Sequence, residues 1–461
     1  MSRSQGEPGV LEIKRRRYAL VGTGHRAKLY VDALTGPYRQ TCQLVALCDP
    51  SRVRMGWHAA RAGATGENPA QYQLGENQAD DFERMLEEAS PETIVVTCVD
   101  AYHAQYIVAA LEHGVDVVTE KPLAVTIEQL RSVIAAGTRS PASVRVTFNA
   151  RYAPEFGALR RLALEGRIGK VHLVELAEIL DTSHGADYFR RWHREMRSSG
   201  GLLVHKACHH FDLVNWWLGS SPKTVSAMGS LCFYGKQNAD RRGESYTYDR
   251  YTGETQAASD PFCLSLDSAG SGELRQLYLD AEAETGYIRD KNVFSAGVDV
   301  EDTAVVSVRY EDNTLLSYTL VSYSPWEGMR VTLTGDRGRI ELSQRLATAG
   351  RQLPGTRAQR ECQVRVVPML GEPEVLDFGS PGTGHQNEDA ATVDAIFGIQ
   401  RDDPFGRAAF LADGVSAALI GIAAERSIGT GNPIDCERLL SSKELCSEDE
   451  VGAGEPVVGT R

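Results

Sequence analysis

The chain has 461 residues, with 49 basic and 62 acidic side chains and a formal net charge of −13. That length exceeds one ordinary domain and predicts at least two. Hydrophobic residues make up 42% and charged residues 24%, a composition that supports a buried core and excludes wholesale disorder. The acidic balance argues against nucleic acid as the main partner and favours a small molecule.

The longest apolar run, residues 417–424, is too short to cross a bilayer, so we expect no membrane association and a cytoplasmic location. The nine cysteines are scattered and never spaced C-x-x-C, which predicts reduced thiols rather than disulfides or a cysteine-built zinc site. Residues 1–13 and 441–461 are rich in polar residues and Gly, and the second stretch is acidic. We expect both to be disordered tails.

The first part of the chain alternates short apolar runs with helical stretches. The apolar runs are residues 18–21, 43–48, 94–98, 115–119 and 143–149, and a helix-like segment lies near 82–89. Strands joined by long crossovers indicate a parallel, doubly wound sheet. Residues 14–150 are therefore predicted to form a Rossmann domain.

The pattern changes after residue 150. Strand candidates joined by turn signals are residues 171–180, 224–233, 303–310, 314–323, 330–334 and 338–342. With one long helix over 200–217 and late helices near 386–398 and 406–427, they predict an α/β domain over 151–435 with a large, mostly antiparallel open sheet. Residues 235–300 form an irregular insertion, which either folds over the site or is a surface loop.

A glycine-rich turn follows the first apolar strand and precedes a helix; it reads Gly22-Thr23-Gly24-His25-Arg26-Ala27. The first glycine permits the tight bend, the second lets a diphosphate approach the backbone, and the small third residue permits close helix packing. The start of the new helix also presents unpaired N–H groups to an anion. These residues predict a dinucleotide-binding turn.

The next strand ends at Asp49, about 25 residues after the second glycine. A carboxylate there accepts hydrogen bonds from adenosine ribose hydroxyls and repels a 2′-phosphate, which favours NAD. Arg52 lies three residues later, and its guanidinium would accommodate that phosphate. NADP therefore stays open as the alternative cofactor.

Three ordered motifs make the sequence resemble the Gfo/Idh/MocA family, named for glucose–fructose oxidoreductase, inositol dehydrogenase and a rhizopine-catabolism protein. They are the glycine turn, Glu120-Lys121-Pro122, and His209-x-x-Asp212 in a helix after Gly200-Gly201. The resemblance covers residues 17–430. It implies a Rossmann domain plus an α/β domain whose open sheet mediates homo-oligomers, dimers or tetramers. It also implies NAD(P)-dependent oxidation of a sugar or cyclitol hydroxyl, or the reverse reduction.

Lys121 follows a strand at the carboxyl edge of the first sheet, where ligands bind. Removing a hydride from a carbinol carbon requires its hydroxyl proton to leave, and a lysine can hold and polarise that oxygen. We therefore predict Lys121 to be catalytic and, with Glu120, to contact the cofactor. The resemblance further implies a cis peptide bond before Pro122.

His205, His209 and Asp212 are spaced four and three residues apart, so one helix would place them on one face. We predict all three to be catalytic, and His209 matches the catalytic histidine of the family. The family commonly has an aspartate where this chain has His205, which leaves the proton route in doubt. Lys206 and His210 are predicted substrate contacts, with an ion pair from Lys206 to Asp212 or Glu120 as an alternative.

Further candidates come from the strand ends and the domain junction. Thr97, Asp100 and His103 follow the strand after which the family contacts the nicotinamide half of the cofactor, and Arg151, Tyr152 and Trp192 are candidate substrate contacts. His385 begins a late helix that could close the pocket. A zinc site built from the histidine cluster is the less favoured alternative, and we predict no metal.

These residues support one main function and two alternatives. The main prediction is an NAD(P)-dependent oxidoreductase acting on a sugar, sugar derivative or cyclitol. One alternative is an NAD-dependent glycoside-cleaving enzyme that works by transient oxidation and elimination, and the other is a non-catalytic NAD(P) sensor. Retention of both Lys121 and His209 argues against the sensor.

Overall fold

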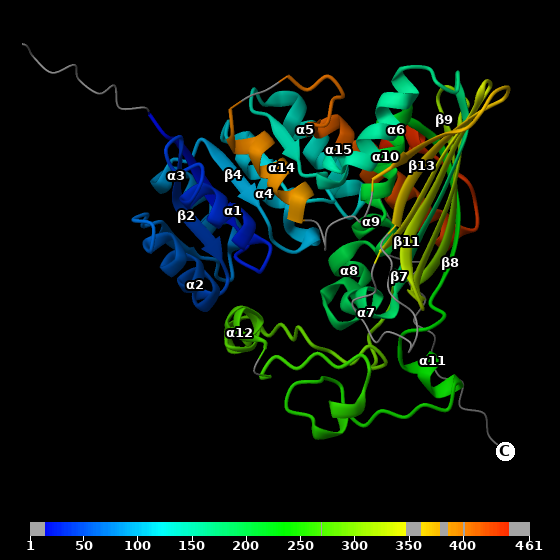
Figure 1. Ribbon diagram of the computed structural model, residues 1–461. Helices are drawn as coiled ribbons and strands as arrows, with labels where there is room; N and C mark the ends of the chain where they lie inside the picture. The colour runs from blue at the N-terminus through cyan, green and yellow to red at the C-terminus, as the bar shows by residue number, and fades with distance from the viewer. Residues whose placement is uncertain (1–13, 269, 347–360, 379–385, 400–401, 442–461) are drawn as a thin grey trace, which may run out of the picture.

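The computed structural model describes residues 14–268, 270–346, 361–378, 386–399 and 402–441 (Figure 1). The predicted tails, apart from Ser441, and His385 lie outside these ranges. The described residues form two sheets side by side with helices between and around them. Among these residues, no helix is both long and apolar enough to span a membrane.

The first sheet has seven strands in the order β15-β6-β5-β4-β1-β2-β3. All pairs are parallel except β15 with β6. Its strands are β1 (Arg16–Val21), β2 (Cys42–Asp49), β3 (Ala70–Gln73), β4 (Thr93–Val96), β5 (Asp116–Thr119), β6 (Val144–Val146) and β15 (Ala409–Phe410). The strand order reverses at β1, where dinucleotides bind in doubly wound sheets. The predicted Rossmann architecture is therefore present.

The crossover helices of this sheet are α1 (Ala27–Thr35), α2 (Arg52–Gly63), α3 (Gln78–Ala89), α4 (His103–Glu112) and α5 (Ile127–Arg139). α3 covers the predicted helix near 82–89 and begins four residues earlier. Its apolar residues recur every three to four positions, and Phe82, Met85, Leu86 and Ala89 are buried. The amphipathic pattern of the sequence thus fixes which face of the helix packs on the sheet.

The second sheet has nine strands in the order β14-β13-β12-β11-β7-β10-β9-β8-β16. β7 and β10 are parallel, and every other pair is antiparallel, as predicted. The strands are β7 (Val171–Asp181), β8 (Pro222–Ser230), β9 (Thr303–Tyr310), β10 (Leu315–Ser324), β11 (Glu327–Gly335), β12 (Gly338–Leu346), β13 (Glu361–Pro368), β14 (Glu374–Asp377) and β16 (Ile434–Asp435). β8 ends three residues before the predicted strand end, because the amides of Cys232 and Phe233 donate to the Asp302 carboxylate.

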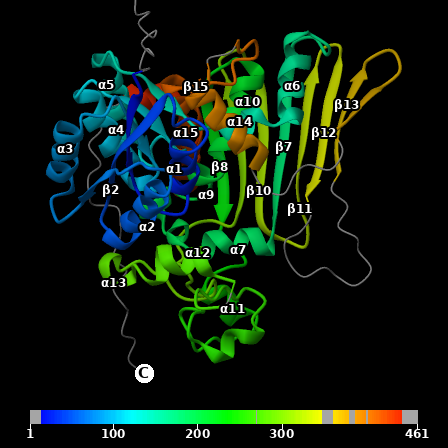
Figure 2. The same ribbon diagram turned by 60° about the vertical axis from the view of Figure 1, so that its left-hand side comes forward.

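The remaining helices lie between the sheets, beside them or below them (Figures 1 and 2). They are α6 (Pro154–Leu164), α7 (Thr182–Arg190), α8 (Met196–Ser199), α9 (Leu202–His205), α10 (Cys208–Leu218), α11 (Lys236–Arg241), α12 (Gly272–Leu274), α13 (Glu282–Thr285), α14 (Gln386–Phe397), α15 (Leu411–Thr430) and α16 (Cys436–Ser441). α11 and α12 lie below the sheets in both views, and α13 does so in Figure 2. The prediction of one helix over 200–217 is wrong, because α9 ends at His205 and α10 begins at Cys208.

The chain returns to the first sheet near its end. β15 pairs with β6, and the Phe397 ring of α14 packs edge-on against Tyr18 of β1, with ring centroids 5.2 Å apart. α15 ends at Thr430 with Gly431 in the left-handed conformation. β15 and α14 therefore contact the first sheet, although they lie within the range 151–435 predicted for the second domain.

Candidate active site

The order of the first sheet places four predicted site residues at neighbouring strand ends. β2, β1, β4 and β5 are consecutive, and their carboxyl ends carry Asp49, the glycine turn, Thr97 and Lys121. Carboxyl ends of parallel strands share one edge of a sheet, and ligands of doubly wound sheets bind there. The predicted cofactor and catalytic residues therefore share that edge.

The glycine turn is held tightly between β1 and β4. Gly22 has a φ of +89°, and a Cβ atom placed on it would lie 2.4 Å from the Cα and N atoms of Cys98. The Thr97 hydroxyl donates to the Gly22 carbonyl oxygen at 2.6 Å, and the Thr23 amide donates to Oδ2 of Asp49 at 2.6 Å. Only glycine fits the first position, so the turn has the form that a diphosphate cradle requires.

Gly22→Ala is expected to destabilise this turn and impair dinucleotide binding. A positive φ in an alanine costs about 1–3 kcal/mol in free energy of unfolding, and the Cβ contact with Cys98 forces the backbone to move. NAD affinity should fall at least tenfold, measured by fluorescence titration beside thermal unfolding. Gly56→Ala is the matched control, because nothing lies within 4 Å of its Cβ position inside α2. Unchanged NAD affinity in Gly22→Ala would contradict the assignment.

The predicted ribose contacts already have protein partners. Both carboxylate oxygens of Asp49 accept backbone amides, from Thr23 and from Ser51 at 2.8 Å, and the side chain is buried. Burial raises the pKa of Asp49, while nearby Arg54 and these hydrogen bonds oppose the rise. The Arg52 guanidinium donates to Gln73 on β3 at 2.5 Å. Asp49 thus braces the glycine turn, and its contact with ribose stays a prediction.

Arg26 links the glycine turn to two distant elements. Its guanidinium donates to Glu120 at 2.5 Å and to both oxygens of Asp389 on α14, at 2.7 and 3.0 Å. The Tyr30 hydroxyl donates to the same Glu120 oxygen at 2.7 Å. Glu120 therefore orients Arg26 beside the turn, and the residue Glu120 is buried, with 8% exposure.

Lys121 lies where α9 and α10 separate. Its ammonium donates to the His205 carbonyl oxygen at 2.9 Å, and the Cys208 thiol donates to the same oxygen at 3.2 Å. The His209 amide bonds to the Lys206 carbonyl instead of continuing the helix. The interruption therefore frees a carbonyl that holds Lys121, and the Lys121–Pro122 peptide bond is cis as the resemblance implied.

A buried carboxylate contacts His205 from the other domain. Asp100, after β4, has Oδ2 2.5 Å from Nδ1 of His205. Burial lowers the pKa of His205 well below its ordinary value, and the charge of Lys121 lowers it further. Burial raises the pKa of Asp100 well above its ordinary value, and Lys121 opposes that rise. An uncharged imidazole held by a carboxylate can accept a proton on its second nitrogen.

Aromatic side chains enclose this pair. The rings of Trp192 and His193 stack with centroids 3.7 Å apart, and His193 lies 4.1 Å from the ring of His205. Tyr188 packs edge-on against both histidines at 5.5 and 5.6 Å. These rings help to bury Asp100 and His205. Trp192 is half-buried, and its contact with a sugar ring stays a prediction.

Lys206 and His210 share a buried carboxylate that the sequence analysis did not single out. Lys206 Nζ lies 3.2 Å from Oε1 of Glu178 on β7, and His210 Nε2 lies 3.6 Å from Oε2. His210 Nδ1 is also 2.9 Å from the Tyr318 hydroxyl. The alternative ion pair from Lys206 to Asp212 or Glu120 is wrong, because Glu178 takes that position. Glu178 was missed because it lies within a strand, far from every motif.

Arg151 and Asp212 form a buried ion pair. Nε and Nη2 of Arg151 donate to the two Asp212 oxygens at 2.7 and 2.6 Å, and Nη2 also donates to Asp413 of α15 at 2.9 Å. Both side chains are at most 2% exposed. The bidentate pair is almost fully buried, so each side chain holds the other in place. The predicted substrate contact of Arg151 and catalytic role of Asp212 stay predictions. The Tyr152 hydroxyl accepts from Arg145 at 3.1 Å.

His103 and His209 differ in exposure. His103 is fully buried, and its ring nitrogens lie 2.7 and 3.2 Å from the carbonyl oxygens of Pro122 and Cys98. It therefore links the residue after Lys121 to the residue that packs on Gly22. His209 lies in the first turn of α10, half-buried, with its ring 6.0 Å from that of Phe148. The expected single face of His205, His209 and Asp212 is absent because the helix is interrupted.

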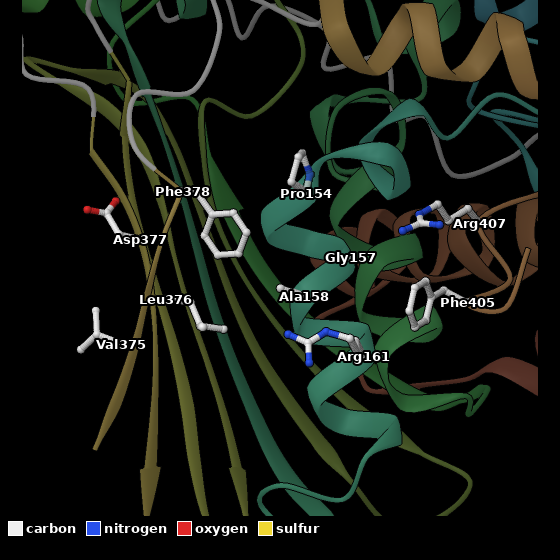
Figure 3. Close-up of a pocket in the computed structure, with 10 residues that line it drawn as sticks. All are labelled: Pro154, Gly157, Ala158, Arg161, Val375, Leu376, Asp377, Phe378, Phe405 and Arg407. Atoms are coloured by element: carbon white, nitrogen blue, oxygen red, sulfur yellow. The ribbon is translucent and has the colours of Figure 1, made fainter. Parts of the chain in front are cut away.

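The described residues contain no group of three or more His, Cys, Asp or Glu side chains arranged to hold a metal ion. A cavity of about 560 Å³ lies between α6 and β14, away from the strand ends described above (Figure 3). Side chains of Pro154, Arg161, Leu376, Phe378 and Phe405 line it. None of its lining residues is a predicted cofactor or substrate contact.

Comparisons with known proteins agree with this architecture. Residues 16–148 match the family model for the NAD-binding Rossmann fold of an oxidoreductase family, and residues 160–435 match the model for its C-terminal alpha/beta domain. The chain is 33% identical over 384 residues to YteT of Bacillus subtilis, named only as an oxidoreductase; the match covers 79% of this chain and 86% of YteT.

Two further relatives carry more specific names. Inositol 2-dehydrogenase of Rhizobium meliloti is 27% identical over 217 residues, which is 47% of this chain and 58% of that protein. The crystal structure of the WlbA dehydrogenase from Bordetella pertussis, in complex with NADH and UDP-GlcNAcA, has a TM-score of 0.58 at 16% identity and covers 92% of this chain and 99% of that one. The family-model matches across both domains confirm the predicted family: the chain belongs to the Gfo/Idh/MocA oxidoreductases.

Proposed function

We propose that this oxidoreductase transfers a hydride between nicotinamide and a hydroxyl-bearing or keto carbon of a sugar, sugar derivative or cyclitol, with NAD as the cofactor. The observation that carries the proposal is the meeting of Lys121 with the Asp100–His205 pair beside the glycine turn. An inositol dehydrogenase among the relatives supports the substrate class.

The cofactor edge has the features that a dinucleotide needs. Because Gly22 has no side chain, the turn packs closely against the end of β4. The backbone amide of His25 donates to the Tyr278 hydroxyl oxygen at 3.0 Å. We infer that the glycine turn holds the diphosphate, which takes the place of the Tyr278 hydroxyl on this amide. When bound, the nicotinamide supplies the hydride acceptor or donor.

Lys121 is assigned to the reacting oxygen. Its ammonium is fixed by the His205 carbonyl, which leaves two N–H donors for a substrate hydroxyl or carbonyl oxygen. A nearby positive charge stabilises the alkoxide character that develops on this oxygen as its proton leaves. Lys121 therefore orients the oxygen and lowers the cost of deprotonation.

The proton is assigned to the histidines of the α9–α10 junction. Above the raised pKa of Asp100, its carboxylate is ionised, Nδ1–H of His205 donates to it, and Nε2 is left to accept a proton. Asp100 thus provides from β4 the carboxylate that the family commonly places at position 205. His209, which matches the catalytic histidine of the family, is the second proton acceptor in this proposal.

A substrate panel tests the function. Purified protein is incubated with NAD and, separately, NADP, and with sugars, cyclitols and aryl glycosides, while NAD(P)H absorbance and aglycone release are recorded. We expect stoichiometric NADH with a sugar or cyclitol. Aglycone release without net NADH would overturn the dehydrogenase in favour of the glycoside-cleaving alternative. Tight NAD binding with neither product would overturn both reactions.

A further inference from the structure

Part of the insertion, residues 235–300, packs against the first domain. Residues 272–287, which include α12 and α13, dock on α1 and α2, and both views show α12 beneath the first domain (Figures 1 and 2). Lys28 pairs with Glu273 at 2.9 Å, and the Trp57 indole donates to Gln276 at 2.7 Å. The segment therefore contacts the two helices that begin at the cofactor edge.

Two contacts fall on the positions that a dinucleotide uses. The Tyr278 hydroxyl accepts the backbone amide of His25 in the glycine turn, at 3.0 Å. Oε2 of Glu284 accepts the Ser51 hydroxyl at 2.5 Å and the Val53 amide at 3.1 Å, at the start of α2. These hydrogen bonds lower the pKa of Glu284, beginning with that from Ser51, so the carboxylate is ionised at neutral pH.

The start of α2 is where a 2′-phosphate would be placed. It directly follows Asp49, the strand-end carboxylate position at which doubly wound domains bind the adenosine ribose. NADP-binding domains place an arginine nearby to take the phosphate. Here Arg52 is turned to Gln73, and Arg54 donates to the Leu277 carbonyl oxygen at 2.8 Å.

We propose that Glu284 of the insertion is a cofactor-specificity residue that excludes the 2′-phosphate of NADP. Its carboxylate occupies the donors of Ser51 and Val53 that a phosphate would use, and its charge repels a dianion. The 2′-hydroxyl of NAD carries no charge and meets no such repulsion. This inference rests on the proposed use of a nicotinamide dinucleotide, and it gives the insertion a function.

Glu284→Gln tests the inference by equilibrium binding rather than turnover. The glutamine keeps an oxygen acceptor for Ser51 and Val53 but removes the charge, so NADP affinity should rise about tenfold at low salt while NAD affinity changes less than about threefold. Binding is measured by protein fluorescence for both dinucleotides. The rise should shrink at high ionic strength, because Glu284 is exposed and its charge is screened.

Glu282→Gln is the matched control, because Glu282 lies on the same short helix and pairs with Arg250, within the insertion. Glu284→Ala is a second variant that must shift NADP affinity in the same direction. An unchanged NADP affinity, or equal changes for both dinucleotides, would overturn the inference alone, as would wild-type protein that binds NADP as tightly as NAD. Wild-type protein that binds neither would overturn the proposed function as well.

Discussion

Lys121→Met should lower kcat by about 10²–10⁴-fold while leaving NAD affinity nearly unchanged. Methionine has nearly the same length as lysine but provides neither the charge nor the donors that we assign to the substrate oxygen. It also removes one positive charge that lowers the pKa of His205. The acidic limb of the kcat/KM profile should therefore move to higher pH. Steady-state kinetics over pH 5–9 measure kcat and the position of the acidic limb, and NAD titration measures the affinity.

Lys170→Met is the matched control for this substitution. Lys170 is a half-exposed lysine beside the start of β7, and its ammonium lies 3.9 Å from Asp312. It should lose neither turnover nor NAD affinity. If Lys121→Met keeps wild-type kcat, the role of Lys121 is wrong. If it loses NAD binding in proportion to kcat, Lys121 acts on the cofactor instead of the substrate oxygen.

The first sheet was predictable because its strands are apolar runs separated by amphipathic helices. β4 reads Thr-Ile-Val-Val and is wholly buried, so its sequence carries the signal of a central parallel strand. β3 was missed because it lies at the sheet edge and reads Ala-Gln-Tyr-Gln, with no buried residue. Local hydrophobicity therefore identified the strands that carry the site but missed the polar edge strand.

The candidate site was only partly predictable, because its main contacts join residues far apart in the chain. Asp100 and His205 are 105 positions apart, and Ser51 and Glu284 are 233 apart. Spacing within one helix suggested instead that His205 acts with Asp212. The helix interruption at Lys206 depends on the Lys121 ammonium and the Cys208 thiol, which satisfy the His205 carbonyl. Such tertiary hydrogen bonds leave no periodic pattern in the sequence.

One of these long-range contacts bears on the aspartate that the family commonly has at position 205 and that this chain lacks. At position 205 this chain has an imidazole, which cannot replace a carboxylate by itself. The Asp100 carboxylate lies 2.5 Å from Nδ1 of His205. It supplies a carboxylate near the site that contacts this histidine. The proposed function therefore gives Asp100 the part of the aspartate that is missing at position 205, and the proton route can be tested at Asp100.

Asp100→Asn should lower kcat/KM on the order of 10²-fold and move its acidic limb to lower pH. The amide keeps the size of the carboxylate but removes its charge, and a neighbouring negative charge favours the protonated imidazole. Without it the pKa of His205 falls further, so the histidine becomes a weaker base. This shift is opposite in sign to that of Lys121→Met. A loss caused only by altered packing would lower the rate without moving the limb.

Asp32→Asn is the control, because it removes a half-exposed carboxylate that pairs with Arg61 in the same domain. The pair is isolated by a double-mutant cycle with His205→Gln. If Asp100 acts through His205, Asp100→Asn adds little to the loss already caused by His205→Gln. Fully additive losses would show that Asp100 acts independently of this histidine. In that case His209 alone is left as the proton acceptor, because Asp100 then has no route to the substrate hydroxyl through the imidazole that it contacts.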